Sequence, residues 1–562
     1  MKAMSSLRRA LTWPKRPTAA EASATTTSSP GKPPFALRYR SSTPFIVGTV
    51  CFAIFTDIFL YGLVVPVMPY AMTERAGIPH DDIQRWNTIL VATYGIALFV
   101  GSPISGIYAD HTSSRRWPLM LGLIALGAST VLLCVGRSIG VFIAGRILQG
   151  FSAAVVWSVG LALLADTMGR RIGLAMGYVA ISLSGGLLFA PLIGGAVYAG
   201  SGYYAVYYVA FGLIVLDILL RLLLIEKKIA RKWIKEEDLV ADTATDVPAV
   251  DEEAAAGTGT AAVPTTSRIA SRVTSHVTDN GLPPTPPEKS TFQRICILFR
   301  SRRLIFALLG CLIDAGIMTA FDTVLPLYVQ ETFNWSSTAA GLIFFALFIP
   351  PLILSPPVGL LADRWGAKWL SLSGFIALVP LLVCLRFVDH NTTHQKILLG
   401  ALLSLIGVAL TFSNVPLMAE ISFTIEAEEE RNPGVWGSKG VYGIGYGLFN
   451  TAFALGSAGG SLLAGFIHTE YSWATMAWVT SIWCGVGILA VAYGVGEFRV
   501  GPPAKPKYNN VMDAAAGVLS EKTATAPAPT PVPVAGLEAE NAPDQTAAAA
   551  ATAAENTKTT DN

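Results

Sequence analysis

The chain has 562 residues, of which 52% are hydrophobic and only 14% are charged. Soluble domains usually carry about 25% charged residues, so this composition excludes an ordinary soluble enzyme and indicates a polytopic membrane protein. The net charge of +2 gives no sign of a nucleic-acid partner. The six cysteines show neither metal-ligand spacing nor a disulfide framework, and we predict no cofactor and no metal.

Twelve apolar stretches are long enough to cross a bilayer, whose hydrocarbon core of about 30 Å requires about 20 helical residues. They cover residues 45–69, 87–109, 117–136, 140–165, 173–199, 203–225, 304–330, 338–361, 369–388, 396–422, 440–467 and 473–496. The sequence therefore predicts an all-α membrane protein with twelve transmembrane helices. Six of them precede a long polar segment and six follow it, which is the arrangement of a two-fold repeat.

Three polar segments flank the two sets of helices and are rich in Ala, Thr, Ser, Pro and Gly. We predict a disordered N-terminal tail at 1–43, a mostly disordered linker at 227–302 and a disordered C-terminal tail at 498–562. The six-helix halves then cover 44–226 and 303–497. At the start of the linker, residues 226–235 place Ile229 and Trp233 on one helical face among five cations, which fits either a surface helix or a charged anchor.

Orientation follows from the distribution of Lys and Arg. The N-terminal tail has eight of these residues and one acid, Glu21, and the short loops on the same side add eight more. The positive-inside rule then places both termini in the cytosol. The same Arg- and Ser-rich, acid-poor tail also fits a mitochondrial transit peptide, although the positive-inside pattern explains the same residues.

An internal repeat appears at the cytosolic end of the second helix of each half. The first copy reads GIYADHTSSRR, from Gly106 to Arg116, and the second reads GLLADRWGAK, from Gly359 to Lys368. Both contain Gly-x-x-Ala-Asp, so Asp110 and Asp363 occupy equivalent positions. Recurrence at the same place in both halves makes this pattern far more specific than either copy alone.

These two loops resemble the Gly-x-x-x-Asp-Arg-x-Gly-Arg/Lys motif of the major facilitator superfamily, and the resemblance covers residues 45–497. It implies two pseudo-symmetric six-helix halves and loops that hold one state closed by linking helix ends. The second copy is nearly complete, with Asp363, Arg364 and Lys368 in place. The first copy has His111 and Ser113 where the motif has Arg and Gly, but it keeps Asp110, Arg115 and Arg116. The departure implies a weaker or differently tuned latch in the first half.

Two further motifs narrow the resemblance to proton-coupled members. The fourth helix contains Arg146-Ile-Leu-Gln149-Gly150, which looks like their Arg-x-x-Gln-Gly element. The fifth helix resembles the antiporter element Gly-x-x-x-Gly-Pro-x-x-Gly-Gly, with Ala190 replacing one glycine; its other residues are Gly186, Pro191, Gly194 and Gly195. Small residues permit close helix contact, and Pro removes a backbone donor and permits a kink.

The spread of motifs is closest to twelve-helix drug:proton antiporters, and within them to vesicular amine transporters, with tails typical of fungal members. Asp57 followed by Val-Val-Pro-x-x-Pro in the first helix, and Asp322 before Leu-Pro in the seventh, carry this resemblance. The Lys and Asp that those transporters pair between the second and eleventh helices are replaced by Tyr94 and Gly445. This departure argues against transferring their substrate specificity or proton stoichiometry.

Charges inside the predicted helices require a reason, because each costs about 2.5–3.5 kcal/mol on insertion scales. Asp57 near Arg146 is the first candidate to bind a proton or a cationic substrate, with Gln149 beside it; a structural ion pair is the alternative. Asp322 is the second candidate, and Asp314 is held in reserve. Glu420 reads as a release-gate carboxylate or a solvated helix end. Asp217 and Arg221, spaced i and i+4, are expected to form a structural pair.

The resulting interpretation is a proton-coupled secondary transporter that exports small organic molecules, hydrophobic or cationic, by alternating access as a monomer in the bilayer. A proton symporter for nutrient uptake and a non-transporting membrane sensor are the alternatives. No catalytic constellation or Gly-x-x-x-x-Gly-Lys-[Ser/Thr] loop occurs, which argues against an enzyme or a pumping ATPase. The plasma membrane is the expected location, and a vacuolar or vesicular membrane is the alternative. Glycosylation sequons at Asn334 and Asn391 fall in loops predicted to face outside.

Overall fold

The computed structural model describes residues 33–64, 67–79, 82–112, 114–230, 233, 290–335, 341–437 and 440–496. These residues form helices joined by turns and short loops, so the predicted all-α architecture is confirmed for the described part of the chain. Most of the predicted N-terminal tail, residues 234–289 of the linker and the whole predicted C-terminal tail lie outside the described residues.

The long helices fall into two sets along the chain. The first set is α4 (Thr43–Val64), α6 (Ile83–His111), α7 (Arg116–Val135), α8 (Ile139–Met168), α9 (Ile172–Ser201) and α10 (Tyr203–Leu223). The second set is α15 (Arg302–Phe333), α17 (Phe344–Trp365), α18 (Ala367–Cys384), α19 (Thr393–Arg431), α20 (Tyr442–Glu470) and α21 (Trp473–Gly494). Shorter elements are α3 (Leu37–Arg40), α5 (Met68–Ala76), η3 (Gly169–Arg171), α11 (Lys227–Ala230), α14 (Thr291–Arg300) and η5 (Leu385–Phe387).

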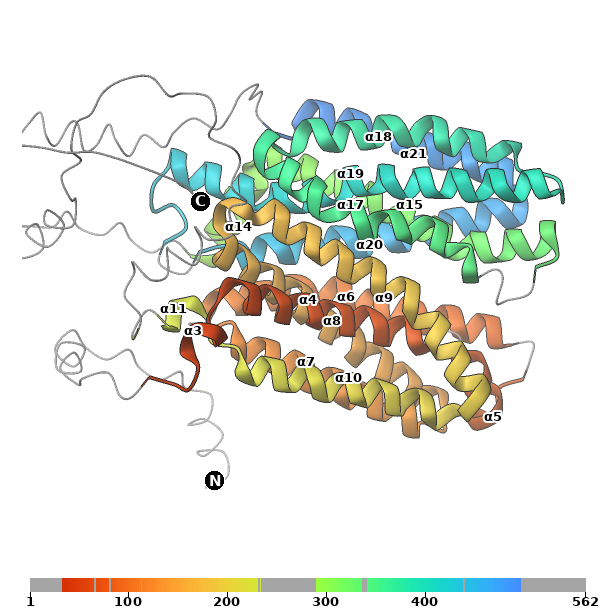
Figure 1. Cartoon of the computed structure of the whole chain (residues 1–562), viewed down its shortest axis with the longest axis horizontal. Coiled ribbons are helices and arrows are strands. Elements are labelled where there is room, and N and C mark those ends of the chain that lie inside the picture. Colours follow the sequence, from red (N-terminus) through yellow and green to blue (C-terminus); the bar gives the residue numbers. More distant parts are fainter. Residues whose placement is uncertain are drawn as a thin grey trace, which may run out of the picture. The chain divides into compact units, whose positions relative to one another are not determined.

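Eleven helical stretches among the described residues are long and apolar enough to cross a membrane. One of these stretches, residues 139–201, comprises both α8 and α9, which meet at η3, where Gly169 has a φ of 47°. Counting α8 and α9 separately gives the twelve helices that the sequence predicts. Figure 1 shows these helices lying lengthwise beside one another, with α3, α11 and α14 at one end of them.

Three elements depart from the predicted boundaries. Helix α4 ends at Val64, although we predicted a span to residue 69, and α5 follows as a separate helix; Pro66 and Pro69 cannot donate backbone hydrogen bonds to a continuing helix. Helix α19 runs to Arg431, beyond the predicted end at 422, because its last turns contain Ala and Glu, which favour helix but not membrane insertion.

The third departure is α14, which lies inside the segment that we predicted to be a mostly disordered linker. The side chain of Ser290 caps this helix by accepting from the backbone N–H of Gln293, and the Gln293 side chain accepts from the N–H of Ser290. This capping box is readable from the sequence Ser-x-x-Gln. The predicted surface helix at 226–235 is described only in part, as α11 and Trp233.

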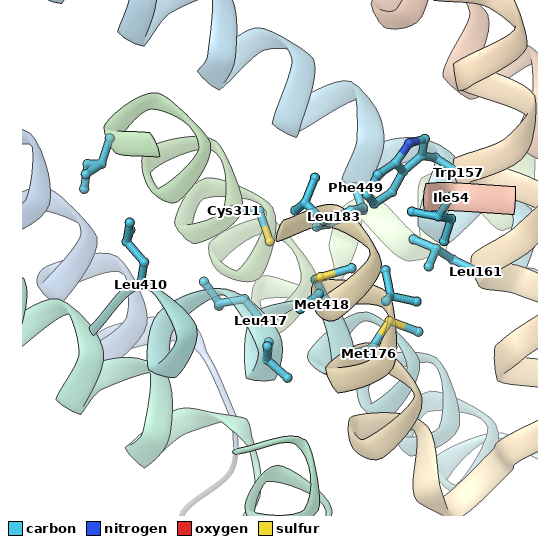
Figure 2. Packing of buried hydrophobic residues seen from close by; sticks show 14 of the residues in the cluster. Ile54, Trp157, Leu161, Met176, Leu183, Cys311, Leu410, Leu417, Met418 and Phe449 are labelled. Atoms are coloured by element: carbon cyan, nitrogen blue, oxygen red, sulfur yellow. The ribbon is translucent and has the colours of Figure 1, made fainter. Parts of the chain in front are cut away.

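The two sets of helices share one hydrophobic core. Its cluster of buried side chains includes Ile54, Trp157 and Leu183 from the first half and Met418 and Phe449 from the second. Figure 2 shows these side chains between helices of both halves. The helix pairs that join the halves are mainly α6 with α20 and α9 with α17.

Candidate functional site

The first copy of the repeated motif joins the halves through one carboxylate. Asp110, near the end of α6, accepts hydrogen bonds from the backbone N–H groups of Gly443 (2.9 Å) and Ile444 (2.8 Å). These groups belong to the first turn of α20, whose N–H groups have no partner within the helix and carry partial positive charge. A buried negative charge at this position therefore holds α6 of one half against α20 of the other.

The second copy repeats this geometry with the halves exchanged. Asp363, near the end of α17, accepts from the backbone N–H groups of Gly173 (2.6 Å) and Leu174 (2.9 Å) in the first turn of α9. We call the end of the helices that contains Asp110 and Asp363 the latch end. The sequence placed both aspartates at equivalent positions, and each of them contacts the opposite half.

Glycines allow the backbones to approach this closely. A methyl group on Gly106 would collide with the carbonyl of Gly443, and one on Gly359 would collide with the carbonyl of Gly173. At the latch end the backbones of the two halves are thus in direct contact in two places, between α6 and α20 and between α17 and α9. The structure is accordingly closed at this end.

The cations of the motif have different partners. Arg115 pairs with Asp110 (2.9 Å) and with Asp166 at the end of α8 (3.1 Å). Arg116 instead donates to the carbonyl of Leu222 (2.7 Å), which ties α7 to the end of α10. In the second half Arg364 is exposed and Lys368 is half-buried at the start of α18.

The predicted antiporter element lies in α9 and packs against α4 of the same half. A methyl group on Gly186 would meet Ile58, and one on Gly194 would meet the backbone of Leu63, whereas one on Gly195 would meet nothing within 4 Å. Pro191 lies inside the helix, which continues past it to Ser201. Gly62 on α4 approaches Pro191 on α9. Gly186, Pro191 and Gly194 therefore lie at the contact between α4 and α9, whereas Gly195 does not.

Asp57 lies in the middle of α4 and is 1% exposed. Its Oδ2 accepts from the indole Nε1 of Trp157 on α8 (3.3 Å), while its Oδ1 has no hydrogen-bond partner among the described residues. The Trp157 ring stacks on Phe453 of α20, with centroids 6.4 Å apart and planes 15° apart. The Trp157 ring therefore lies between Asp57 and Phe453 of the other half.

Arg146 lies elsewhere than we expected. Its guanidinium donates to Oε1 of Gln149 (3.0 Å) and lies 5.6 Å from the ring centre of Tyr61, but no ion pair joins it to Asp57 among the described residues. Arg146 and Trp157 are eleven residues apart, or about 16 Å along α8. Arg146 therefore lies against Tyr61, one turn beyond Asp57 on α4, and Trp157 is the hydrogen-bond partner of Asp57.

The second half contributes acidic residues at three depths. Asp322, in the outer part of α15, is half-buried and acts electrostatically on Tyr61 of the first half. Asp314, two turns earlier, is 1% exposed and accepts from the Ser413 hydroxyl and from Nδ2 of Asn414 (2.6 Å) on α19. Tyr61 is thus influenced by Arg146 of its own half and by Asp322 of the other half.

Glu420 is fully buried toward the latch end of α19. It accepts from the guanidinium of Arg303 on α15, with Nη2 to Oε2 at 3.1 Å, and from the backbone N–H of Gly496 (3.0 Å). The alternative of a solvated helix end is therefore wrong. In the first half Arg221 donates to both oxygens of Asp217 (2.9 and 2.6 Å), and both side chains are buried.

Both sequons lie at the end opposite the latch end. Asn334 is the residue after α15, with a φ of 54°, and Asn391 precedes α19 and donates to the carbonyl of Phe333 (3.3 Å). Both side chains are exposed. Among the described residues, no group of three or more His, Cys, Asp and Glu side chains could hold a metal ion.

The sequence analysis did not predict two contacts between the halves. Nδ2 of Asn450 on α20 donates to the hydroxyl of Ser102 on α6 (2.7 Å), and both residues are buried. An asparagine in an apolar helix, such as Asn450, is recognisable in the sequence as a residue that needs a hydrogen-bond partner. The sequence does not show that the partner is Ser102. The Trp157–Phe453 pair carried no signal of its own, because most aromatic residues in membrane helices pack or anchor at interfaces.

Two joined six-helix sets, with a pair of equivalent aspartates that each bind the opposite set, form an arrangement typical of membrane transporters built from internal repeats. The model of the Major Facilitator Superfamily matches residues 50–330 and 306–530, and the chain belongs to this family. The family and its relatives are transporters and not enzymes, as expected.

Two relatives and one solved structure illustrate the range of similarity. The "Uncharacterized MFS-type transporter C18.02" of Schizosaccharomyces pombe is 32% identical over 80% of this chain and 95% of its own length. The "Probable vesicular acetylcholine transporter-B" of Danio rerio is 28% identical over 27% of this chain and 32% of its own length. The crystal structure of the human organic anion transporter MFSD10 has the same fold, with a TM-score of 0.56 and 16% identity over 80% of this chain and 99% of that chain. The resemblance to vesicular and fungal members is thus confirmed.

Proposed function

We propose that this transporter exports small organic molecules in exchange for protons and that Asp57 binds the proton and the substrate in alternation. The observation that carries the proposal is the environment of Asp57: a fully buried carboxylate in mid-helix with one oxygen that has no hydrogen-bond partner among the described residues. Such a group is costly in a bilayer unless it binds a proton or a cation.

The aromatic residues around Asp57 suit an organic substrate. Trp157 and Phe453 stack beside it, and one turn further along α4 the rings of Tyr61 and Tyr94 lie 4.6 Å apart. Aromatic faces attract cations and bury apolar surface. A cationic or hydrophobic molecule is therefore the substrate class that this region fits best.

Asp322 and Arg146 are proposed to line the path on the outer side of Asp57. They come from different halves and both act on Tyr61, so a change in the separation of the halves changes their mutual distance. Gln149 and Glu420 are proposed to support this path, Gln149 by holding Arg146 and Glu420 at the latch end.

Alternating access would proceed by rocking one half against the other. In the closed-latch conformation, protonation of Asp57 would release the substrate on the side opposite the latch end. Loss of the proton after the latch opens would allow reloading. We place the latch end and both termini in the cytosol, the protein in the plasma membrane and the working unit as a monomer.

The test is transport into membrane vesicles under an imposed pH gradient, with a panel of labelled organic cations and drugs. Asp57→Asn is expected to abolish gradient-driven transport while membrane insertion stays normal. Glu74→Gln, which removes an exposed acid from α5 of the same half, is the matched control. Unchanged coupled transport in Asp57→Asn would refute the proposal. Movement of substrate in the same direction as protons would favour symport instead.

A further inference from the structure

A cavity of about 820 Å³ lies at the latch end of the second half. It is formed where α14 ends, α15 begins, α19 ends and α21 gives way to the residues after Gly494. Among the described residues that line it, four are arginines and one is acidic: Arg300, Arg302, Arg303, Arg431 and Glu428. None of these residues belongs to the proposed transport path.

Among the described residues that line the cavity, cations outnumber acids. Glu420 binds Arg303 and so compensates one cation in the cavity wall. Glu428 accepts from Nδ2 of Asn432 (2.8 Å), a neutral donor. Arg300 and Arg302, which also line the cavity, are exposed.

The start of α15 adds to this field. Ser301 caps the helix by accepting from the N–H of Leu304, and Ser301, Arg302 and Arg303 all line the cavity. The first N–H groups of a helix lack intrahelical partners and carry partial positive charge. Arginines around a helix N-terminus form an arrangement that binds phosphate.

The surroundings of the cavity place it at the level of the membrane surface. The guanidinium of Arg302 lies 4.8 Å above the ring of Tyr493 on α21, and Tyr493 is 65% exposed. On α14, Phe292 (74% exposed) and Phe299 (48% exposed) also present large apolar side chains. Exposed aromatic residues beside arginines are typical of the membrane–water interface.

We propose that this cavity binds the phosphate-bearing headgroup of an anionic lipid from the leaflet at the latch end. Arginines and a helix N-terminus would hold the phosphate, while Tyr493 and the apolar face of α15 would contact the acyl chains. Basic pockets between transmembrane helices recognise such headgroups through the same chemistry. This inference does not depend on the proposed substrate or on proton coupling.

The experiment measures binding of fluorescent phosphatidylinositol 4-phosphate to the purified full-length protein in phosphatidylcholine nanodiscs. The double variant Arg300→Gln/Arg302→Gln is expected to weaken binding about tenfold or more. The matched control Arg38→Gln/Lys228→Gln removes two exposed cations from the latch end of the first half and is expected to bind as the wild type does. Equal binding by all three proteins, or equal loss in both variants, would overturn the proposal.

Two further arms separate the source of the phosphate and guard against misfolding. Inorganic phosphate and soluble inositol phosphate are expected to compete poorly with the lipid; displacement of the lipid at equal concentration would show a small-anion site and overturn the lipid assignment. Glu428→Gln removes the acid from the cavity and is expected to tighten lipid binding, a gain that misfolding cannot produce. Unchanged or weaker binding in this variant would contradict the proposal.

Discussion

The two latches contain equivalent aspartates that bind the opposite half in the same way. The arginine near each aspartate, however, comes from the same half in the first latch and from the opposite half in the second. Asp110 and Asp363 each accept two backbone N–H groups from the first turn of a helix in the opposite half. The cation at Asp110 is Arg115 of the same half. Asp363 has no such ion pair among those described, but Arg171 of the opposite half favours its charged form electrostatically.

This difference implies unequal consequences when the halves separate. Asp110 would lose its two backbone partners but keep Arg115, so its charge would stay neutralised. Asp363 would lose its backbone partners and also move away from Arg171. The first copy departs most from the family motif. We infer that the two latches differ in whether the aspartate keeps a nearby arginine when the halves separate.

The largest effect is expected from filling the backbone contact of either latch. Gly106→Val and Gly359→Val would force the opposing helix away, at a cost of about 1–3 kcal/mol, so the open latch should become roughly 5- to 150-fold more populated. Distances between spin labels at the exposed positions Trp117 and Trp365 would measure this in a Cys296→Ser background. Gly212→Val, where a methyl group meets nothing, is the control; an unchanged distance distribution in both latch variants would contradict the closure described above.

Arg115→Gln is expected to change a different quantity, the thermal stability, and not the position of the latch equilibrium. The change leaves Asp110 and Asp166 without their shared cation within one half, so the thermal stability should fall by roughly 1–3 kcal/mol, less than for a fully buried pair because the Asp166 side chain is 41% exposed. The spin-label distance should hardly change. Arg38→Gln, at an exposed position of the same half, is the matched control. A large shift in distance with unchanged stability would reverse our view of the first latch.

Asp110→Asn and Asp363→Asn should each loosen the latch without a steric effect. Asparagine keeps one acceptor but loses the charge that binds the helix N-terminus, and we expect about 1–2 kcal/mol, or roughly a five- to thirty-fold shift toward the open latch. The same spin labels report the shift, and Asp389→Asn, at the opposite end, provides the control. If neither variant moves the equilibrium, the backbone contacts alone hold the halves together.

The smallest effect is expected from Arg171→Gln, which should weaken closure by about 0.3–1 kcal/mol because the guanidinium is partly exposed to solvent. The effect should shrink in high salt. It should also disappear in the Asp363→Asn background, which a double-mutant cycle would show. A full effect of Arg171→Gln without Asp363 would mean that this arginine acts through another partner.

Much of the fold could be predicted because membrane insertion depends on apolar length. The twelve spans could be predicted for this reason, but the helix ends could not. Helix α19 continues through Glu428 to Arg431, and hydropathy does not detect these polar last turns. Helix α14 was readable from its Ser290–Gln293 capping box, but the surrounding low-complexity sequence obscured it.

The candidate site divides in the same way. Repetition of Gly-x-x-Ala-Asp identified Asp110 and Asp363, but their partners are backbone N–H groups, which every residue except proline carries. Burial singled out Asp57, but its contact with Trp157 depends on the rotation of α8 relative to α4, which a single sequence does not encode locally. Charges were therefore predictable as positions, and their partners were not.

The length of α19 has a mechanical consequence. Its 39 residues correspond to about 58 Å, whereas a bilayer with its headgroups is about 40–45 Å thick, so the helix must tilt strongly or protrude. Glu420 and Arg303 fasten it to α15 several turns before its tip. The tip then acts as a rigid lever, and a small rotation of the second half would be magnified into a large sweep of the acidic turns near Arg431. A probe attached there would report rocking with greater amplitude than one within the membrane.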